Sequence, residues 1–347
     1  LDGDPYIRRY YYLHGHYDNK KTERKGIMKP LSTLIVSVLT AAIITGCGTD
    51  SAEPEVPAEQ TEPEVETKGN IEEVEFPHMH GLAFTEDGEK AYTPAHDGLR
   101  VFEDGIWKRV DGPRHDYMGF SMTADGFYSS GHPSMQTDYE HPLGIIKSTD
   151  EGKSIEVLGL EGEVDFHLMT AGYRSGAIYV INPQSNSSME DTGLYVTTNE
   201  AKDWEKGDMD GVSGNIIAIA AHPNKKGIVA VSTDEGVFLS QDAGDTFEQV
   251  LEGSPVPALT FTHDGKVLAA EGIGKETTLQ VIDSSGETQQ IPAPEIKEED
   301  AISYIAKNPQ SPETLMFTTM ERDIFHTTDN GETWEQTVQD GKSQNNS

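Results

Sequence analysis

A short turn motif that recurs along the chain constrains its fold more than any other feature of the sequence. The last copy runs from Thr327 to Trp334 and reads Thr-Thr-Asp-Asn-Gly-Glu-Thr-Trp. In such a turn Asp329 can accept hydrogen bonds from nearby backbone amides, Gly331 can take a positive φ, and Trp334 can anchor the next strand in the core. The motif therefore predicts a tight connection between two β-strands.

The copies are spaced almost evenly. Their Asp positions are residues 150, 199, 242 and 329, so the separations are 49, 43 and 87 residues, and the last is about two periods. A degenerate copy from Ile282 to Thr288 divides that gap, and a shortened hairpin from Val101 to Trp107 lies one period before the first copy. Six units with this period predict an all-β propeller of six four-stranded blades. A seventh blade would form if Ile71 to Phe76 paired with a further strand. The structural residues of the clear copies are Asp150, Gly152, Asn199, Trp204, Asp242, Gly244, Phe247, Asp329, Gly331 and Trp334.

Each unit is expected to begin with an inner strand. The predicted inner strands are His78 to Thr85, Tyr117 to Thr123, Asp165 to Ala171, Asn215 to Ala221, Ala258 to Thr262 and Ile302 to Lys307.

The repeated motif resembles the Asp-box, or BNR, repeat of a β-propeller family that includes sialidases, sortilin-type receptors and photosystem assembly factors. This resemblance implies the fold, and it carries no set of ligand residues to this chain. Sialidases of the family hold a carboxylate with three arginines and carry an Arg-Ile-Pro type signature on the first inner strand. Here His78-Met79-His80 stands in that place, and none of the predicted inner strands contains an arginine. The chain therefore does not match a typical sialidase.

The N-terminal region predicts export. Residues 1–27 contain no methionine, so we expect translation to start at Met28 and these residues to be upstream sequence that is not native to the protein. Residues 28–46 resemble a signal peptide, because Lys29 precedes an apolar stretch of 14 residues that is too short to span a bilayer comfortably.

The signal peptide ends in Ile44-Thr45-Gly46-Cys47, which matches a bacterial lipobox. Cys47 is the only cysteine and is the predicted lipidation site, so the domain must fold without disulfides. Residues 47–75 comprise this cysteine and an acidic Pro/Glu linker that we expect to be disordered. The propeller is placed at 76–338 and a polar tail at 339–347. We therefore expect an extracytoplasmic protein anchored to the bacterial cell membrane by its lipid.

The charge of the chain limits its partners. Lysine and arginine total 26 against 60 aspartates and glutamates, which gives a net charge of −34. A field of that sign repels nucleic acid and anionic membrane surfaces. Nucleic acid is therefore excluded as a partner, and the acidity itself is typical of solubility or adaptation to salt or alkali.

Histidines gather on the face of the predicted propeller opposite the repeated turns, in the first three blades. Methionines and acids accompany them. Histidine with methionine would favour copper, and histidine with aspartate would favour zinc or another divalent ion. The alternative is that these side chains simply line the mouth of the propeller and satisfy buried carbonyls. The candidate metal ligands are His78, His80, His96, His115, Asp116, His132 and His167, and His141 maps to the same face.

Two other functions remain open from the sequence. A glycoside hydrolase would need two carboxylates about 5 to 10 Å apart, and Asp97, Asp116, Glu163 and Asp165 are expected near this face. A binding or assembly module would need only an exposed surface. Two long polar loops, Ser130 to Pro142 and Asn182 to Thr192, offer one to a protein or glycan ligand.

Overall fold

The computed structural model describes residues 73–345. The predicted upstream segment, signal peptide, lipidation site Cys47 and most of the linker lie outside the described residues. Within 73–345 no helix is long and apolar enough to cross a membrane. The one helix of this range is the 3-10 turn η1 (Gly274–Glu276).

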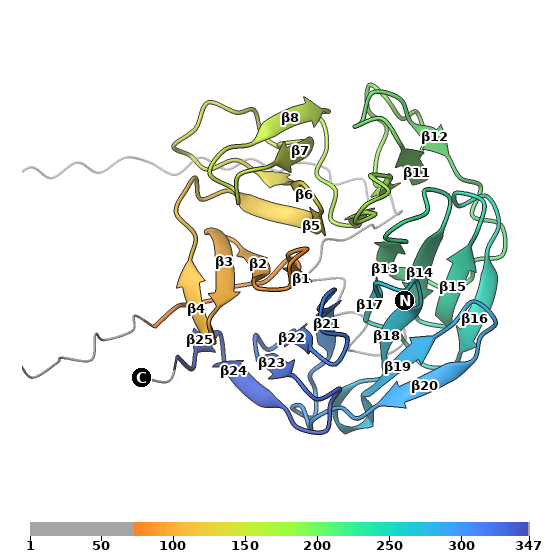
Figure 1. Cartoon of the computed structure of the whole chain (residues 1–347). Coiled ribbons are helices and arrows are strands. Elements are labelled where there is room, and N and C mark those ends of the chain that lie inside the picture. The colour runs from red at the N-terminus through yellow and green to blue at the C-terminus, as the bar shows by residue number, and fades with distance from the viewer. Residues whose placement is uncertain (1–72, 346–347) are drawn as a thin grey trace, which may run out of the picture. The chain divides into compact units, whose positions relative to one another are not determined.

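Six antiparallel sheets are arranged around a ring (Figure 1). The first three blades contain β1 (Ala83–Phe84), β2 (Ala91–Ala95), β3 (Gly98–Glu103) and β4 (Ile106–Arg109); β5 (Asp116–Thr123), β6 (Gly126–His132), β7 (Ile145–Ser148) and β8 (Glu156–Gly159); and β9 (Met169–Ala171), β10 (Ile178–Asn182), β11 (Gly193–Thr197) and β12 (Glu205–Lys206). The last three contain β13 (Ile216–Ala221), β14 (Val229–Thr233), β15 (Gly236–Ser240) and β16 (Glu248–Glu252); β17 (Ala258–Phe261), β18 (Val267–Glu271), β19 (Thr278–Ile282) and β20 (Thr288–Ile291); and β21 (Ile302–Lys307), β22 (Leu315–Thr319), β23 (Ile324–Thr327), β24 (Glu335–Gln339) and β25 (Lys342–Ser343).

The first strand of every blade lies innermost. Each sheet keeps the order of the chain, and the first strands contact one another around the ring from β1 through β5, β9, β13, β17 and β21 back to β1. This confirms the all-β propeller of six blades. Two inner strands are shorter than predicted, because the residues before β1 and β9 leave the regular ladder; Met79 makes only an isolated bridge to Ala95.

The recurring turns form as the sequence predicts. At Asp242 one carboxylate oxygen accepts the Thr246 amide at 2.9 Å, and the other accepts the Thr246 hydroxyl at 2.6 Å. These hydrogen bonds, with a further one from Ser240, lower the pKa of Asp242 to about 2. Asp329 has the same contacts with Thr333 and a similar pKa. The turns lie between the third and fourth strands, so they all occupy one face of the ring.

Both ends of the described chain close the ring between the first and last blades. The amide of Phe76 donates to Gly341 at 2.8 Å, Ser343 donates to Val74 at 2.9 Å, and Glu75 pairs with Lys342. Residues from 73 onward therefore complete the sixth blade and start no seventh one. Part of the predicted polar tail also joins the sheet, because Lys342 and Ser343 form β25.

Trp107 of β4 stabilises the ring closure between the first and last blades. Its side chain is 1% exposed, and its indole NH donates to the Thr337 hydroxyl at 3.1 Å. Its backbone NH and C=O each bond the side chain of Asn345, at 2.9 and 3.1 Å. The ring of Phe76 meets the indole edge to face at 5.1 Å. These contacts join β4, the outer strand of the first blade, to the last blade, and the first blade carries several of the predicted site residues.

A second set of contacts between blades lies on the face of the recurring turns. Arg174, in the turn after β9, donates to Glu86 at 2.6 Å and to His263 Nε2 at 2.6 Å. Glu86 follows β1 and His263 follows β17, so the guanidinium links the first, third and fifth blades. The opposite face carries the candidate ligands.

Candidate metal centre

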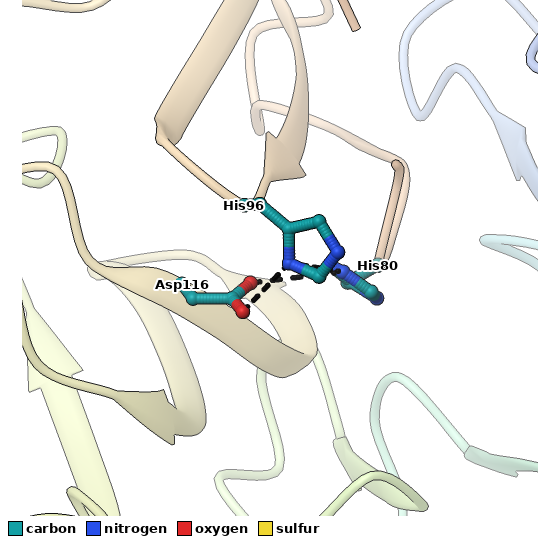
Figure 2. A group of neighbouring side chains, drawn as sticks. All are labelled: His80, His96 and Asp116. Carbon is teal, nitrogen blue, oxygen red and sulfur yellow. Dashed lines mark hydrogen bonds and ion pairs between the residues drawn. The ribbon is translucent and has the colours of Figure 1, made fainter. Parts of the chain in front are cut away.

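Three candidate ligands meet between the first and second blades (Figure 2). His96 Nδ1 lies 2.7 Å from Asp116 Oδ2 and 3.4 Å from His80 Nε2. His80 Nε2 lies 3.6 Å from Asp116 Oδ1. One ligand atom from each of the three residues lies within 4.8 Å of the other two. We call His80, His96 and Asp116 the first histidine group.

The strand pattern brings these residues together. The amide of His80 donates to Pro94 at 3.1 Å, which fixes it beside the end of β2. His96 follows at once in the tight turn from β2 to β3, where Ala95 pairs with Gly98. Asp116 is the first residue of β5, the inner strand of the next blade. Two blades therefore supply the group, and the ring closure and blade packing hold it together.

Burial differs among the three side chains. His80 is 11% exposed and Asp116 is 17% exposed, whereas His96 is 43% exposed. Asp116 Oδ1 is buried and accepts no hydrogen bond from the described residues, and it lies 3.6 Å from His80 Nε2. A buried carboxylate oxygen that accepts no hydrogen bond is costly, so a cation beside this atom would stabilise it.

The donor set fits a transition-metal cation. Zinc binds imidazole nitrogen and carboxylate oxygen at about 2.0 to 2.2 Å, so ligand atoms around one tetrahedral ion lie roughly 3.4 Å apart. The 3.4 and 3.6 Å distances match that spacing, whereas the 2.7 Å contact between His96 and Asp116 is a hydrogen bond that metal binding would lengthen. Two imidazoles and a carboxylate would be three of the four ligands of a tetrahedral zinc ion, as in catalytic sites that complete the set with water or substrate.

His78 lies beside the group. Its ring centroid is 5.0 Å from that of His96 and 6.4 Å from that of His80. Burial lowers the pKa of His78, and the charges of His96 and Arg322 lower it further. A neutral imidazole is the form that binds metal.

A second group forms one blade further on. His167 Nε2 and His132 Nε2 lie 2.8 and 3.3 Å from the same atom, Asp165 Oδ2. The ring of His132 stacks on that of His141, with centroids 4.4 Å apart and planes inclined by 9°. The hydrogen bond to Asp165 raises the pKa of His167. We call His132, Asp165 and His167 the second histidine group.

The structure does not bring His115 to either group. Its side chain is fully buried, its Nδ1 accepts the Ser134 amide at 3.0 Å, and its ring meets Tyr117 and Tyr139 edge to face. His115 and Asp116 are consecutive, so their side chains project to opposite sides of the strand. Burial lowers the pKa of His115.

The methionines predicted beside the histidines are divided between core and solvent. Met79, Met118, Met122 and Met169 are all less than a tenth exposed, and three of them belong to hydrophobic clusters of the core. Met135 in the long loop after β6 is completely exposed. The ligand atoms that lie close together in the two groups are therefore nitrogen and oxygen, the set that suits zinc or copper(II).

Two of the four candidate catalytic acids, Asp97 and Glu163, are stabilised in their ionised form. Burial alone would raise the pKa of Asp97, but hydrogen bonds from Arg109 and Arg100 at 2.6 and 2.5 Å lower it below its ordinary value. Hydrogen bonds from Ser187 lower the pKa of Glu163. Neither residue has the raised pKa that a general acid needs for glycoside hydrolysis.

The fold and its ring of blades define the chain as a six-bladed β-propeller. No family model matches the sequence. A stretch of 79 residues, 22% of the chain, is 37% identical to a xyloglucanase of Hypocrea jecorina (strain QM6a), and the match spans 9% of that protein.

Solved propellers resemble the structure at low sequence identity. A putative gluconolactonase is 14% identical, with a TM-score of 0.50 over 78% of this chain and 94% of that one. A GH74 xyloglucanase from Xanthomonas campestris is 15% identical, with a TM-score of 0.49 over 77% of this chain and 46% of that one. YCF48 from Cyanidioschyzon merolae is 15% identical, with a TM-score of 0.45 over 79% and 89%. At these identities the likeness concerns the fold alone.

Proposed function

We propose that this chain is an extracytoplasmic lipoprotein whose propeller belongs among the Asp-box repeat proteins and binds a divalent transition-metal cation through the first histidine group. The lipid on Cys47 would hold the propeller at the cell membrane, and the acidic linker would hold it away from the surface. The protein would act as a binding or assembly module, with the metal as ligand or as part of the surface that a protein or glycan contacts.

One observation carries the metal-binding proposal. His80, His96 and Asp116 come from three separate segments in two blades, and their ligand atoms meet within 4.8 Å. Polar surface residues that share no ligand have no functional reason to bring their ligand atoms so close together. The buried Asp116 Oδ1 supports the same conclusion, because it accepts no hydrogen bond from the described residues and a cation would neutralise its charge.

The donor set favours zinc or copper(II). Both ions accept imidazole and carboxylate ligands, whereas copper(I) prefers thioether or thiolate sulfur. The methionines near the histidines are mostly packed in the core, which argues against copper(I) at the first histidine group.

Elemental analysis of the full chain, purified without an affinity tag, tests the proposal. The protein is incubated with zinc or copper(II), passed through a desalting column and compared with a His80→Ala/His96→Ala variant. His263→Ala serves as the matched control, because it removes an imidazole from the opposite face. We expect retained metal that the double variant loses and the control keeps. Protein that retains no metal, or a double variant that retains as much as the wild type, would contradict the proposal.

A second candidate function is hydrolysis of a glycan. The 37% identity to a xyloglucanase over 79 residues favours it, although this match covers only a fifth of the chain. Asp116 and Asp165 would be the acids, since Asp97 and Glu163 are engaged as carboxylates. Release of reducing sugar from xyloglucan, or of chromophore from aryl glycosides, that stops in Asp116→Asn or Asp165→Asn would establish this activity.

A further inference from the structure

A cavity of about 440 Å³ lies between the fifth and sixth blades. It is lined by residues of the turn after β17, the turn after β21 and the recurring turn after β23. In an antiparallel blade the first and third turns lie at the same end, so the cavity is on the face opposite the two histidine groups. Ligand pockets in proteins commonly have volumes of about 300 to 1,000 Å³. The cavity is therefore large enough for a small molecule, and it is separate from the first histidine group.

Part of the lining is apolar. Ile291 of β20 belongs to the hydrophobic cluster that the fifth and sixth blades share, and Val281 of β19 packs against this cluster. Pro312, from the turn after β21, adds a third apolar side chain. A hydrocarbon group that covered these side chains would remove apolar surface from water, so the lining favours a ligand with an apolar portion.

Two lysines line the same cavity. Lys266 lies in the turn after β17, and Lys307 ends β21. Neither ammonium group makes an ion pair or a hydrogen bond with the residues that the structure describes. Six other lysines of this range each pair with a carboxylate at 3.0 Å or less, as expected in a chain with a net charge of −34. Two unpaired ammonium groups in one cavity therefore mark a place where an anion would be stabilised.

The ammonium group of Lys307 is costly to bury. Burial lowers the pKa of Lys307, the charge of Asp264 raises it, and the charge of Lys266 lowers it again. The side chain is thus half-buried beside a second cation. A carboxylate in contact with Nζ would offset the cost of removing this charge from water.

His263 and Asn330 add neutral donors to the lining. Arg174 Nη1 lies 2.6 Å from His263 Nε2. A guanidinium can only donate, so Nε2 accepts and the proton of the imidazole is on Nδ1. Burial and the charge of Arg174 lower the pKa of His263, in agreement with a neutral ring. Neither this Nδ1–H nor the side-chain amide of Asn330 has a hydrogen-bond partner within residues 73–345, so both can donate to a ligand.

Two acids limit the charge of the ligand. Asp264 and Glu313 also line the cavity, and Asp264 Oδ1 accepts the Thr262 hydroxyl at 2.6 Å. Their charges cancel those of Lys266 and Lys307. Both acids would repel a doubly charged phosphate more strongly than a monoanion. The lining therefore favours a single carboxylate over a phosphate.

We propose that this cavity binds a small monocarboxylate, with the carboxylate between Lys266 and Lys307 and the apolar portion against Val281 and Ile291. The inference goes beyond the proposed function and does not rest on it, because no lining residue belongs to either histidine group. The propeller would then bind a metal cation on one face and an organic anion on the other.

Saturation-transfer difference nuclear magnetic resonance of the full chain with hexanoate tests the inference. Hexanoate carries a carboxylate on a short apolar chain, and hexanamide has the same size without the charge. At 0.15 M salt the Debye length is about 8 Å, so distant acids of the chain contribute little. We expect saturable binding of hexanoate that is weaker by about tenfold or more for Lys307→Gln, and likewise for hexanamide with the wild type, because each change removes a hydrogen bond between charged groups.

Lys153→Gln is the matched control, because Lys153 is an exposed lysine in the recurring turn of the second blade. We expect this variant to bind hexanoate as the wild type does. Circular dichroism shows whether Lys307→Gln is folded, and Lys266→Gln, which changes an exposed residue, replaces it if it is not.

The contrary outcomes are specific. No saturable binding of hexanoate at millimolar concentrations, or binding that both lysine variants leave unchanged, would refute the site. Hexanamide or inorganic phosphate that binds as tightly as hexanoate would refute the ligand class. Hexanoate binding that is lost in His80→Ala/His96→Ala would place the anion at the first histidine group and refute the inference, while the metal analysis of that variant judges the proposed function separately.

Discussion

Replacement of Trp107 by alanine should destabilise the propeller more than any other single tryptophan substitution. Trp107 is 1% exposed and fastens the junction of the first and last blades. Burial of a tryptophan side chain removes on the order of 200 Å² from water, which corresponds to about 5 kcal/mol as an upper bound. Measured losses for large aromatic residues in cores are about 3 to 5 kcal/mol.

The hydrogen bond of the indole adds little to this sum. Thr337 loses the indole NH as a partner but can still donate its hydroxyl to Ile324 at 3.4 Å, so the extra cost is about 1 kcal/mol. The total of about 4 to 6 kcal/mol is a large part of the roughly 5 to 15 kcal/mol that stabilises a typical domain. We therefore expect Trp107→Ala to be marginally folded at 25 °C.

Urea denaturation followed by circular dichroism gives the free energy of unfolding. Trp334→Ala is the matched control, because this indole is only partly buried, packs on Phe317 and bonds Pro292 within the outer part of the ring. We expect the control to lose about 1 to 3 kcal/mol, in line with its smaller buried area. A loss at Trp107 below about 2 kcal/mol, or no greater than that at Trp334, would refute the assignment of the ring closure to this side chain.

Three further predictions follow from the same structure. Gly244→Ala should lower the free energy of unfolding by about 1 to 3 kcal/mol in urea denaturation, because φ is +100° and the new Cβ would lie 2.2 Å from Leu194; an unchanged midpoint would contradict this. Burial raises the pKa of Asp300 above its ordinary 3.8, so the folded protein loses stability as the pH rises and this carboxyl ionises. In thermal unfolding, the stability of Asp300→Asn relative to the wild type should therefore increase between pH 4 and 7. A relative stability that decreases over this range would contradict the raised pKa. A bound cation at about 100 times its Kd should add about 2.7 kcal/mol to the free energy of unfolding, and the gain should vanish with EDTA and in His80→Ala/His96→Ala; a gain that this double variant keeps would exclude these imidazoles as ligands.

The blades could be predicted from the sequence because their signal is local. Each recurring turn depends on residues within eight positions, such as Asp242 and Thr246, and the spacing of the copies sets the number of units. The ring closure could not be predicted in this way. Lys342 pairs with Glu75 across the described length of the chain. Lys342 stands in a short polar segment, and although Val74-Glu75-Phe76 alternates apolar and polar residues, nothing local in the sequence identifies its partner. The sequence therefore predicts a polar tail at residues 339–347, although part of this range forms β25.

The candidate site was predictable as a region but not as a set of contacts. The blade order placed the histidines on one face in the first three blades. The sequence could not show that His115 is buried with its ring against Tyr117 while its neighbour Asp116 joins His80 and His96. That choice depends on where β5 begins relative to the preceding loop, which a prediction resolves only to within a few residues. Asp165, considered as a catalytic acid, turned out to lie between two imidazoles.

The pairing of Val74 to Phe76 with β25 also determines how the molecule would respond to force. The chain continues on the N-terminal side from residue 73, so tension applied there reaches Glu75 and its neighbours before any blade. Their hydrogen bonds to Gly341 and Ser343 run across the strand direction, and a pull along the strand would load them together in shear. The edge at which the ring is closed is therefore also its mechanical clamp, and the blades behind it would stay folded until that clamp yields.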